Sequence, residues 1–202
     1  MKKLFLHLAF ISSLLSCSKK PTEEIHGSEM NYIDLKDARI SYNTYQHVDL
    51  DNDNKTDFTF LTLLVGDPLL IRDELHFYAT SKIHSLLLND EHDESPVLSK
   101  DQLIEAEIQE FTWYEVSSIL LVEKLMYKDG IIYWDGLWKN VNHRYLPVQI
   151  KKEGKPYFGW IELSFDKATE ILKLHKAAIS KEPYKGAKSW LLIMEHAIKK
   201  LI

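Results

Sequence analysis

The chain has 202 residues, of which 45% are hydrophobic and 27% are charged, and its formal net charge is −5 at pH 7. This length and apolar content suit one globular domain with a sizeable core. The acidic balance argues against nucleic acid as a partner and against electrostatic docking on anionic lipid, because both need a basic face.

The N-terminus is typical of a bacterial export signal. A basic start at residues 1–3 is followed by an apolar run over residues 4–15, which is too short to span a bilayer and has the length of a signal-peptide core. Two leucines then precede Ser16 and Cys17, an ending that resembles the bacterial lipobox. By that resemblance the signal peptide, residues 1–16, is cleaved off, and Cys17 receives several acyl chains, which anchor a protein durably.

The segment after the signal peptide, residues 17–30, is polar and charged and contains Pro21. It is expected to be a flexible tether between the anchor and one folded domain, residues 31–202. Ser18 stands where an Asp is associated with inner-membrane retention, so the lipobox resemblance implies a cell-envelope location anchored in the outer membrane. Since Cys17 is the only cysteine, the sequence excludes a disulfide and a thiol nucleophile in that domain.

A short acidic loop gives the most specific chemical information in the chain. Its acidic residues stand at positions 1, 3, 5 and 9, which is the ligand spacing of a calcium loop. Crowded carboxylates repel one another, and a Ca²⁺ ion removes that repulsion by accepting about six to eight oxygen ligands. The predicted metal ligands are the four carboxylates and the backbone carbonyl at position 7: Asp49, Asp51, Asp53, Asp57 and Lys55.

Two positions depart from the calcium loop of an EF-hand. Asn54 replaces the usual glycine at position 6, where Asn is the next-best residue because its short side chain tolerates positive φ. Phe60 stands at position 12 in place of a bidentate Glu, and residues 58–65 are rich in β-formers. The sequence therefore predicts a loop between strands that binds Ca²⁺ weakly, with a Kd on the order of 0.1–1 mM. The alternative is a solvated acidic turn without metal.

Short β-prone runs separated by turn residues predict a mainly β fold, an antiparallel β-sandwich-like domain. Asp129 and Gly130 predict a hairpin turn, and Pro147 predicts an edge strand or a bulge, because proline has no N–H to donate. The alternation in the last run places Ile161 and Trp160 on opposite faces. The predicted strands are residues 39–45, 58–65, 75–79, 119–124, 131–134, 146–151 and 157–165.

Three stretches carry helical patterns. Residues 99–111 begin with a capping-box pair, Ser99 and Gln102, and predict a short helix. Residues 170–179 fit a strand by alternation and a helix by apolar spacing, and the spacing favours the helix. Residues 190–200 carry one apolar stripe with lysines at its end, which predicts a C-terminal helix docked on the sheet.

The acidic loop and the run Y-F-G-W-I-E-L at residues 157–163 together resemble a group of uncharacterised secreted bacterial proteins. Those proteins carry an Asp-rich D-x-N-x-D-G-x-x-D-F loop early and a Y-x-G-W-I/L-x-L strand late. The resemblance covers about residues 40–180 and implies a β-sandwich with a calcium loop and a strand at residues 170–179. It supplies no activity, and Asn54 departs from the loop glycine.

No sequence motif assigns a reaction. The chain lacks a nucleophile elbow, a zinc-protease motif, a phosphate-binding glycine loop and a dinucleotide fingerprint, so an enzyme is the less favoured class. Asp135 and Glu162 are one carboxylate pair that would suit glycoside hydrolysis, but no spacing singles them out. The sequence favours a non-catalytic, Ca²⁺-stabilised envelope protein.

The alternative function is a carbohydrate-binding module. Tyr133, Trp134 and Trp138 lie close together in the chain, and exposed aromatic rings can stack on sugar faces. The competing interpretation places these rings in the core, where large apolar side chains belong. Solvent exposure of the rings separates a glycan-binding surface from a core.

Overall fold

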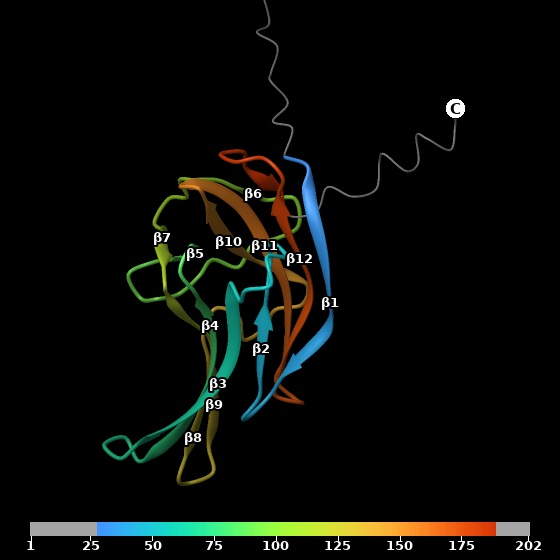
Figure 1. Ribbon diagram of the computed structural model, residues 1–202. Coiled ribbons are helices and arrows are strands. Elements are labelled where there is room, and N and C mark those ends of the chain that lie inside the picture. Colours follow the sequence, from blue (N-terminus) through green and yellow to red (C-terminus); the bar gives the residue numbers. More distant parts are fainter. Residues whose placement is uncertain (1–27, 189–202) are drawn as a thin grey trace, which may run out of the picture.

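The computed structural model describes residues 28–188, which form two antiparallel sheets packed face to face (Figure 1). The mainly β, sandwich-like prediction is therefore confirmed. None of the described residues lies in a helix that is long and apolar enough to cross a membrane. The predicted helix at residues 190–200 lies outside the described residues, as do Cys17 and most of the predicted tether.

The first sheet has six strands and the second has five. In spatial order the first sheet contains β1 (Met30–Ile40), β12 (Ile171–Ser180), β11 (Lys155–Asp166), β10 (Arg144–Lys152), β5 (Ser85–Asn89) and β7 (Thr112–Glu115). The second sheet contains β2 (Tyr45–Val48), β3 (Phe58–Asp67), β4 (Arg72–Ser81), β8 (Ser118–Tyr127) and β9 (Ile132–Asp135). A separate two-stranded pair joins β6 (Leu103–Ile104) and β13 (Ala187–Lys188).

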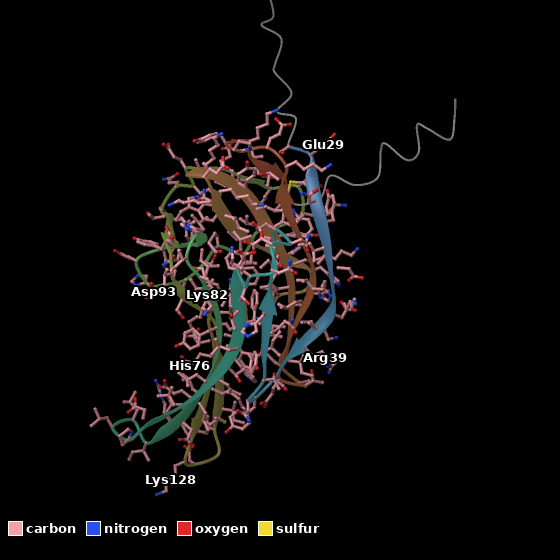
Figure 2. The ribbon with its side chains drawn as sticks, viewed as in Figure 1. Glu29, Arg39, His76, Lys82, Asp93 and Lys128 are labelled. Carbon is pink, nitrogen blue, oxygen red and sulfur yellow. The ribbon has the colours of Figure 1, made fainter. Side chains whose placement is uncertain are left out.

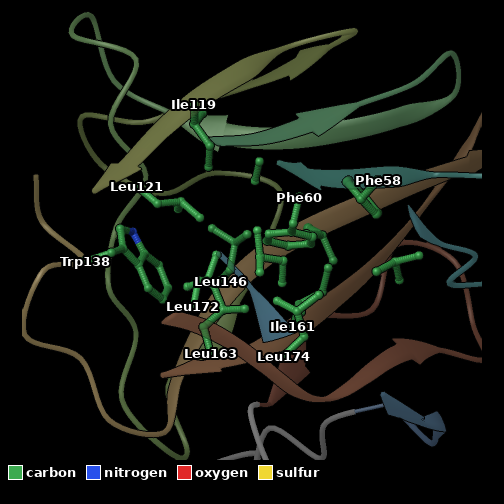
Figure 3. Packing of buried hydrophobic residues seen from close by; sticks show 14 of the residues in the cluster. Phe58, Phe60, Ile119, Leu121, Trp138, Leu146, Ile161, Leu163, Leu172 and Leu174 are labelled. Atoms are coloured by element: carbon green, nitrogen blue, oxygen red, sulfur yellow. The ribbon is translucent and has the colours of Figure 1, made fainter. Parts of the chain in front are cut away.

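One apolar cluster fills the space between the two sheets (Figure 3). Phe58 and Phe60 of β3 and Ile119 of β8 enter it from the second sheet, and they meet Leu163 of β11 and Leu174 of β12 from the first. All five side chains are fully buried. Burial of one such side chain stabilises the folded state by about 1.5–3 kcal/mol, so this cluster is the main force that holds the sheets together.

Strand β11 is buried on both of its faces. Ile161 faces the cluster between the sheets, whereas Phe158 and Trp160 belong to a second apolar cluster on the outer side of the first sheet. Ile104 of β6 and Ala187 of β13 are members of this second cluster. The expected division of residues 157–165 into two faces is confirmed, and the β6–β13 pair covers the outer face.

Gly130 and Pro147 both stand at positions where the backbone suits their special geometry. Gly130 adopts φ +86° and donates its N–H to the carbonyl oxygen of Tyr127 at 2.9 Å, which closes the predicted β8–β9 hairpin. Pro147 lies in β10, an inner strand and not the predicted edge, where it pairs with Trp160 of β11. The ladder between β10 and β5 stops at Val148, next to Pro147, so the missing N–H falls where no partner strand needs it.

Residues 99–111 form turns and the short strand β6, so the predicted helix is wrong. The side chain of Gln102 does accept a hydrogen bond from the N–H of Ser99. However, the N–H of Gln102 also donates to the carbonyl oxygen of Ser99, which closes a turn, and Asp101 and Glu110 have φ of +68° and +70°. A right-handed helix cannot pass through these two residues.

At two further stretches, cross-strand pairing and not the local sequence pattern determines where a strand begins or ends. Residues 170–179 are strand β12 from residue 171 onward, as the family resemblance implied and against the helical spacing. Leu172 and Leu174 both enter the main core because they alternate with outward-facing neighbours. The predicted strand at residues 39–45 is interrupted by a turn at 41–44, where Asn43 adopts φ +59°.

Gly159 is expected to be intolerant of any side chain. A Cβ at this position would lie 2.3 Å from the carbonyl oxygen of Ala178 on the neighbouring strand β12. Gly159→Ala should therefore lower the free energy of unfolding by about 1–3 kcal/mol, and each kcal/mol lowers the melting temperature by about 2–4 °C. Gly66→Ala is the matched control, since the nearest atom to its Cβ is 3.5 Å away. Equal melting temperatures for the two variants would contradict the close approach of β11 to β12.

Candidate metal centre

The acidic loop joins β2 to β3 and is closed at its base. Val48 and Phe58 are cross-strand partners, and the N–H of Asp57 donates to the carbonyl oxygen of Val48 at 2.9 Å. Leu50 is fully buried, so it fixes the first half of the loop to the core. Asn54 adopts φ +65°, the left-handed conformation expected from its place in the sequence. The loop is therefore a defined turn between two core strands.

Three carboxylates of the loop converge. One oxygen each from Asp49, Asp51 and Asp57 lies within 4.8 Å of the other two. A single metal ion can bridge atoms at this spacing, and a set made only of carboxylate oxygens suits a hard cation. The structure thus brings together three of the four predicted carboxylates as a group that could hold a metal ion.

Asp57 is closely constrained by its surroundings. The residue is only 8% exposed. Its Oδ2 accepts a hydrogen bond from the N–H of Leu50 at 2.7 Å, and its Oδ1 accepts one from the hydroxyl of Ser85 at 3.0 Å. Burial raises the pKa of the Asp57 carboxyl, the two hydrogen bonds oppose that rise, and the charges of Asp51 and Asp49 add to it. A bound cation would stabilise the ionised form and so oppose the effect of burial.

The group also ties the two sheets together. Nζ of Lys152, in β10 of the first sheet, lies 2.9 Å from Oδ2 of Asp51, whose side chain is only 9% exposed. Ser85, the hydrogen-bond partner of Asp57, belongs to β5 of the same sheet. A loop of the second sheet is therefore attached to the first sheet through two of its three converging carboxylates.

Asp53, the fourth predicted carboxylate, lies outside the converging group. Its Oδ1 accepts the N–H of Lys55 at 2.8 Å, and its Oδ2 lies 3.0 Å from Nζ of Lys55. The side chain of Lys55 is 81% exposed, which agrees with a role for its backbone carbonyl alone. The N–H groups of Asp53 and Asn54 donate to Asp49 at 3.2 and 2.8 Å and so orient that carboxylate toward the centre of the loop.

The aromatic residues considered for sugar binding do not form a surface platform. Trp138 is fully buried, and its Nε1 donates to the carbonyl oxygen of Ser95 at 3.0 Å. Trp134 is partly buried and packs edge-on against Phe165, with ring centroids 5.4 Å apart. Tyr133 alone of the three is largely exposed, at 57%. Of the two interpretations, burial of Trp138 supports the one that places these rings in the core, and the glycan-binding alternative loses this residue.

The carboxylate pair considered for glycoside hydrolysis is divided between the two sheets. Asp135 ends β9 and accepts a hydrogen bond from Nζ of Lys139 at 2.8 Å. Glu162 lies in β11, with its Oε1 2.7 Å from Nδ1 of His143. Each carboxylate has its own partner, and the structure does not single them out as a pair.

Sequence reasoning missed a polar centre on the outer face of the first sheet. Oδ1 of Asp37 lies 2.5 Å from Nδ1 of His175, and Nε2 of His175 lies 2.8 Å from the hydroxyl of Ser164. The ring of His143 stacks on that of His175, with centroids 4.3 Å apart. These residues come from distant parts of the chain and meet only through strand pairing, so no spacing in the sequence could reveal them.

The order carboxylate, imidazole, hydroxyl is that of a serine-hydrolase triad. A cavity of about 390 Å³ adjoins these residues, and Asp37, His143 and His175 line it, whereas Ser164 does not. The N–H of His143 donates to the Ser164 hydroxyl at 2.9 Å and thereby holds it on the sheet. Since Oγ of Ser164 also lies 3.3 Å from Oδ1 of Asn142, which can accept its proton, we interpret this chain of hydrogen bonds as a cross-strand link between β1, β12 and β11.

Comparison with known proteins adds no family to this geometry. Neither family models nor curated proteins nor solved structures give a match to the chain. The resemblance to secreted proteins with a similar loop and strand therefore stays a prediction, and the functional argument rests on the residues themselves.

In the metal-free protein, ionisation of Asp57 is expected to reduce stability. Because its folded-state pKa lies above the ordinary value of 3.8, the folded state holds this proton more tightly than the unfolded chain does. Stability therefore falls as the pH rises through the window between the two values, and the loss is fully present above it. Asp57→Asn keeps an acceptor for the Leu50 N–H without the charge, so it should remove this fall.

Urea unfolding in chelator across the acid range would measure the effect. Asp53→Asn is the control, because Asp53 is exposed and its hydrogen bond with Lys55 holds its pKa below the usual range. The Asp53→Asn variant should still lose stability as the pH rises, because Asp57 is unchanged in it. The same pH dependence in wild type and Asp57→Asn would contradict the assignment.

Proposed function

We propose that this protein is a lipid-anchored envelope domain whose β-sandwich is stabilised by Ca²⁺. The observation that carries the proposal is the convergence of Asp49, Asp51 and Asp57 at the point where the loop of one sheet contacts the other. A cation at this point removes the repulsion among three carboxylates. Because it binds only the folded loop, it also shifts the folding equilibrium toward the native sandwich.

The donor set supports calcium over other ions. Carboxylate and carbonyl oxygens are its usual ligands, and Ca²⁺ accepts them in variable number and geometry. Mg²⁺ demands near-octahedral geometry at short distances and gives up its water reluctantly, so it should substitute poorly. The absence of a Glu at position 12 fits the weak sites of extracellular modules, which work at millimolar calcium.

The place where β1 begins supports presentation on a tether. β1 starts at Met30 at one end of the sandwich, and the β3–β4 and β8–β9 hairpins reach the opposite end (Figure 1). The turn between β3 and β4 exposes three apolar side chains, Leu69, Leu70 and Ile71, and Leu69 is 91% exposed. These side chains lie at the end of the sandwich opposite the start of β1 (Figure 1), where an envelope protein could contact them. Burial of Trp138 makes a glycan the less favoured partner.

Calcium is expected to raise the melting temperature. With a Kd of about 0.3 mM, raising free Ca²⁺ from chelated levels to about 3 mM should add roughly 1.4 kcal/mol of stability. This corresponds to a shift of roughly 3–5 °C for a domain of this size. Asp51→Asn should abolish the shift, because it weakens a ligand at the centre of the group.

Two variants serve as controls in the same thermal melts. Lys55→Ala should keep the shift, since the side chain of Lys55 points to solvent. Glu91→Gln should also keep it, since Glu91 lies outside the acidic loop and its side chain is 87% exposed. An unchanged midpoint between chelator and about 10 mM Ca²⁺ would show that the loop is a plain acidic turn.

The lipid anchor is tested separately from the metal. Cys17→Ala removes the only thiol that could be lipidated, so the variant should accumulate as an uncleaved precursor or leave the membrane as soluble protein. Ser18→Ala is the matched control and should remain anchored. Wild-type protein from cells should enter the detergent phase of a phase-separation assay, and its recovery in the aqueous phase would refute the anchor.

A further inference from the structure

A second cluster of ligating side chains lies on the outer face of the five-stranded sheet. His76 in β4 and Glu123 in β8 are direct cross-strand partners. Glu74 precedes His76 by two residues and so shares its face, whereas Leu75 and Phe77 point to the core between the sheets. Figure 2 labels His76 on this sheet.

Three ligand atoms of this cluster converge on one point. Nε2 of His76 lies 3.1 Å from Oε2 of Glu74 and 2.7 Å from Oε1 of Glu123. His76 is only 8% exposed, and the side chains of Glu74 and Glu123 are 12% and 17% exposed. The three side chains are therefore largely shielded from solvent. They stand on two paired strands, which position side chains more firmly than a loop does.

Neighbouring side chains fix the orientation of two of the three ligands. The hydroxyl of Tyr78 lies 3.0 Å from Nδ1 of His76, which is the ring nitrogen that faces away from the cluster. Arg72 approaches the other oxygen of Glu74, Oε1, with Nε at 2.7 Å and Nη2 at 2.6 Å, which leaves Oε2 directed at His76. Partners of this kind, on the far side of a histidine and a carboxylate, are the usual outer support of metal ligands.

The convergence has a consequence for hydrogen bonding. Nε2 of His76 can carry one proton, and one proton makes one good hydrogen bond, yet two carboxylate oxygens approach this nitrogen. A divalent cation can engage the nitrogen and both oxygens at once. We propose that Glu74, His76 and Glu123 form a divalent transition-metal site, with Zn²⁺ as the preferred ion.

The chemistry of the donor set selects the metal class. An imidazole nitrogen with carboxylate oxygens suits Zn²⁺ and its first-row neighbours, whereas Ca²⁺ and Mg²⁺ prefer oxygen alone. Tetrahedral zinc with bonds of about 2.0–2.2 Å places its ligand atoms roughly 3.3 Å apart. The present distances of 2.7 and 3.1 Å need to widen by only a few tenths of an ångström, which small side-chain rotations supply. Three protein ligands leave one position for water.

The test measures zinc bound to the purified, untagged full-length protein, with Ca²⁺ in excess to occupy the acidic loop. Metal analysis after equilibrium dialysis should give about one zinc per chain. His76→Gln and Glu123→Gln should each weaken zinc binding at least tenfold. Tyr78→Phe, which alters only the orientation of His76, should weaken it by about tenfold while the stoichiometry is unchanged.

Two controls separate this site from surface histidines and from the loop. His92→Gln should bind zinc as wild type does, since His92 has a side chain that is 73% exposed. Asp51→Asn should also bind it normally, even though that variant loses the calcium response. Equal losses in His92→Gln and His76→Gln, or displacement of the zinc by millimolar Ca²⁺, would overturn the proposal.

A spectroscopic measurement keeps the proposal falsifiable if a variant fails to fold. Co²⁺ replaces Zn²⁺ in such sites, and a four-coordinate nitrogen–oxygen environment gives visible absorption much stronger than that of the aqueous ion. Wild-type protein should show this absorption at one equivalent of Co²⁺, and Zn²⁺ should displace it. Wild-type protein that binds less than one zinc and leaves the cobalt spectrum that of the aqueous ion would refute the site.

Discussion

The sandwich depends on the burial of β11 on both of its faces. Ile161 packs between the two sheets, and Trp160 packs outward under the β6–β13 pair, so one strand belongs to two apolar clusters. Such a strand must lie close to its neighbours, and Gly159 permits this, since even a methyl group there would collide with the backbone of β12. The run Y-F-G-W-I-E-L therefore has a physical reason at nearly every position, and it needs no ligand to explain it.

The acidic loop is possible because strongly apolar residues flank it. Val48 and Leu50 on one side and Phe58 and Phe60 on the other are all fixed in the core. Their burial compensates for the repulsion among carboxylates that the turn between them brings together. Lys152 and Ser85 then attach the turn to the other sheet. An ion in the loop would therefore act on the contact between the sheets and not only on a surface turn.

Local patterns in the sequence predicted the sandwich class and the strands β3, β4, β8, β9, β10 and β11, but not β5, β7 or most of β1. Runs of β-forming residues located the strands around Phe60, Ile119 and Ile161, and all three side chains enter the core between the sheets. The pattern failed at residues 99–111, where Ile104 is buried by pairing with β13, some eighty residues away in sequence. It was ambiguous at residues 170–179, because three consecutive buried residues, Ala177 to Ile179, break a simple alternation and mimic helical spacing.

The acidic loop was predicted from the sequence because its carboxylates are close together in the chain. Three converging carboxylates come from nine consecutive residues, so their spacing alone indicated a cation. The partners Lys152 and Ser85 come from other strands, so no residue close to the loop in the sequence predicts them. The cluster around His76 is harder still to predict, because Glu123 joins it only through the register of β4 and β8. Trp138 was also hard to place, because its backbone N–H donates to the carbonyl oxygen of Leu121 in β8 and its indole N–H donates to that of Ser95.

The two groups of metal-ligating residues differ in how their charge is balanced. In the loop, three carboxylates have one close cation, Lys152, because Lys55 pairs with Asp53 outside the group. In the cluster around His76, Arg72 lies against Glu74, so one of the two carboxylates has a close permanent cation. The loop therefore retains more uncompensated negative charge than the cluster does, and an added cation relieves it. It follows that metal in the loop should act chiefly on stability. Metal in the cluster would have three protein ligands on two rigid strands, so it should act chiefly on what binds at the open position.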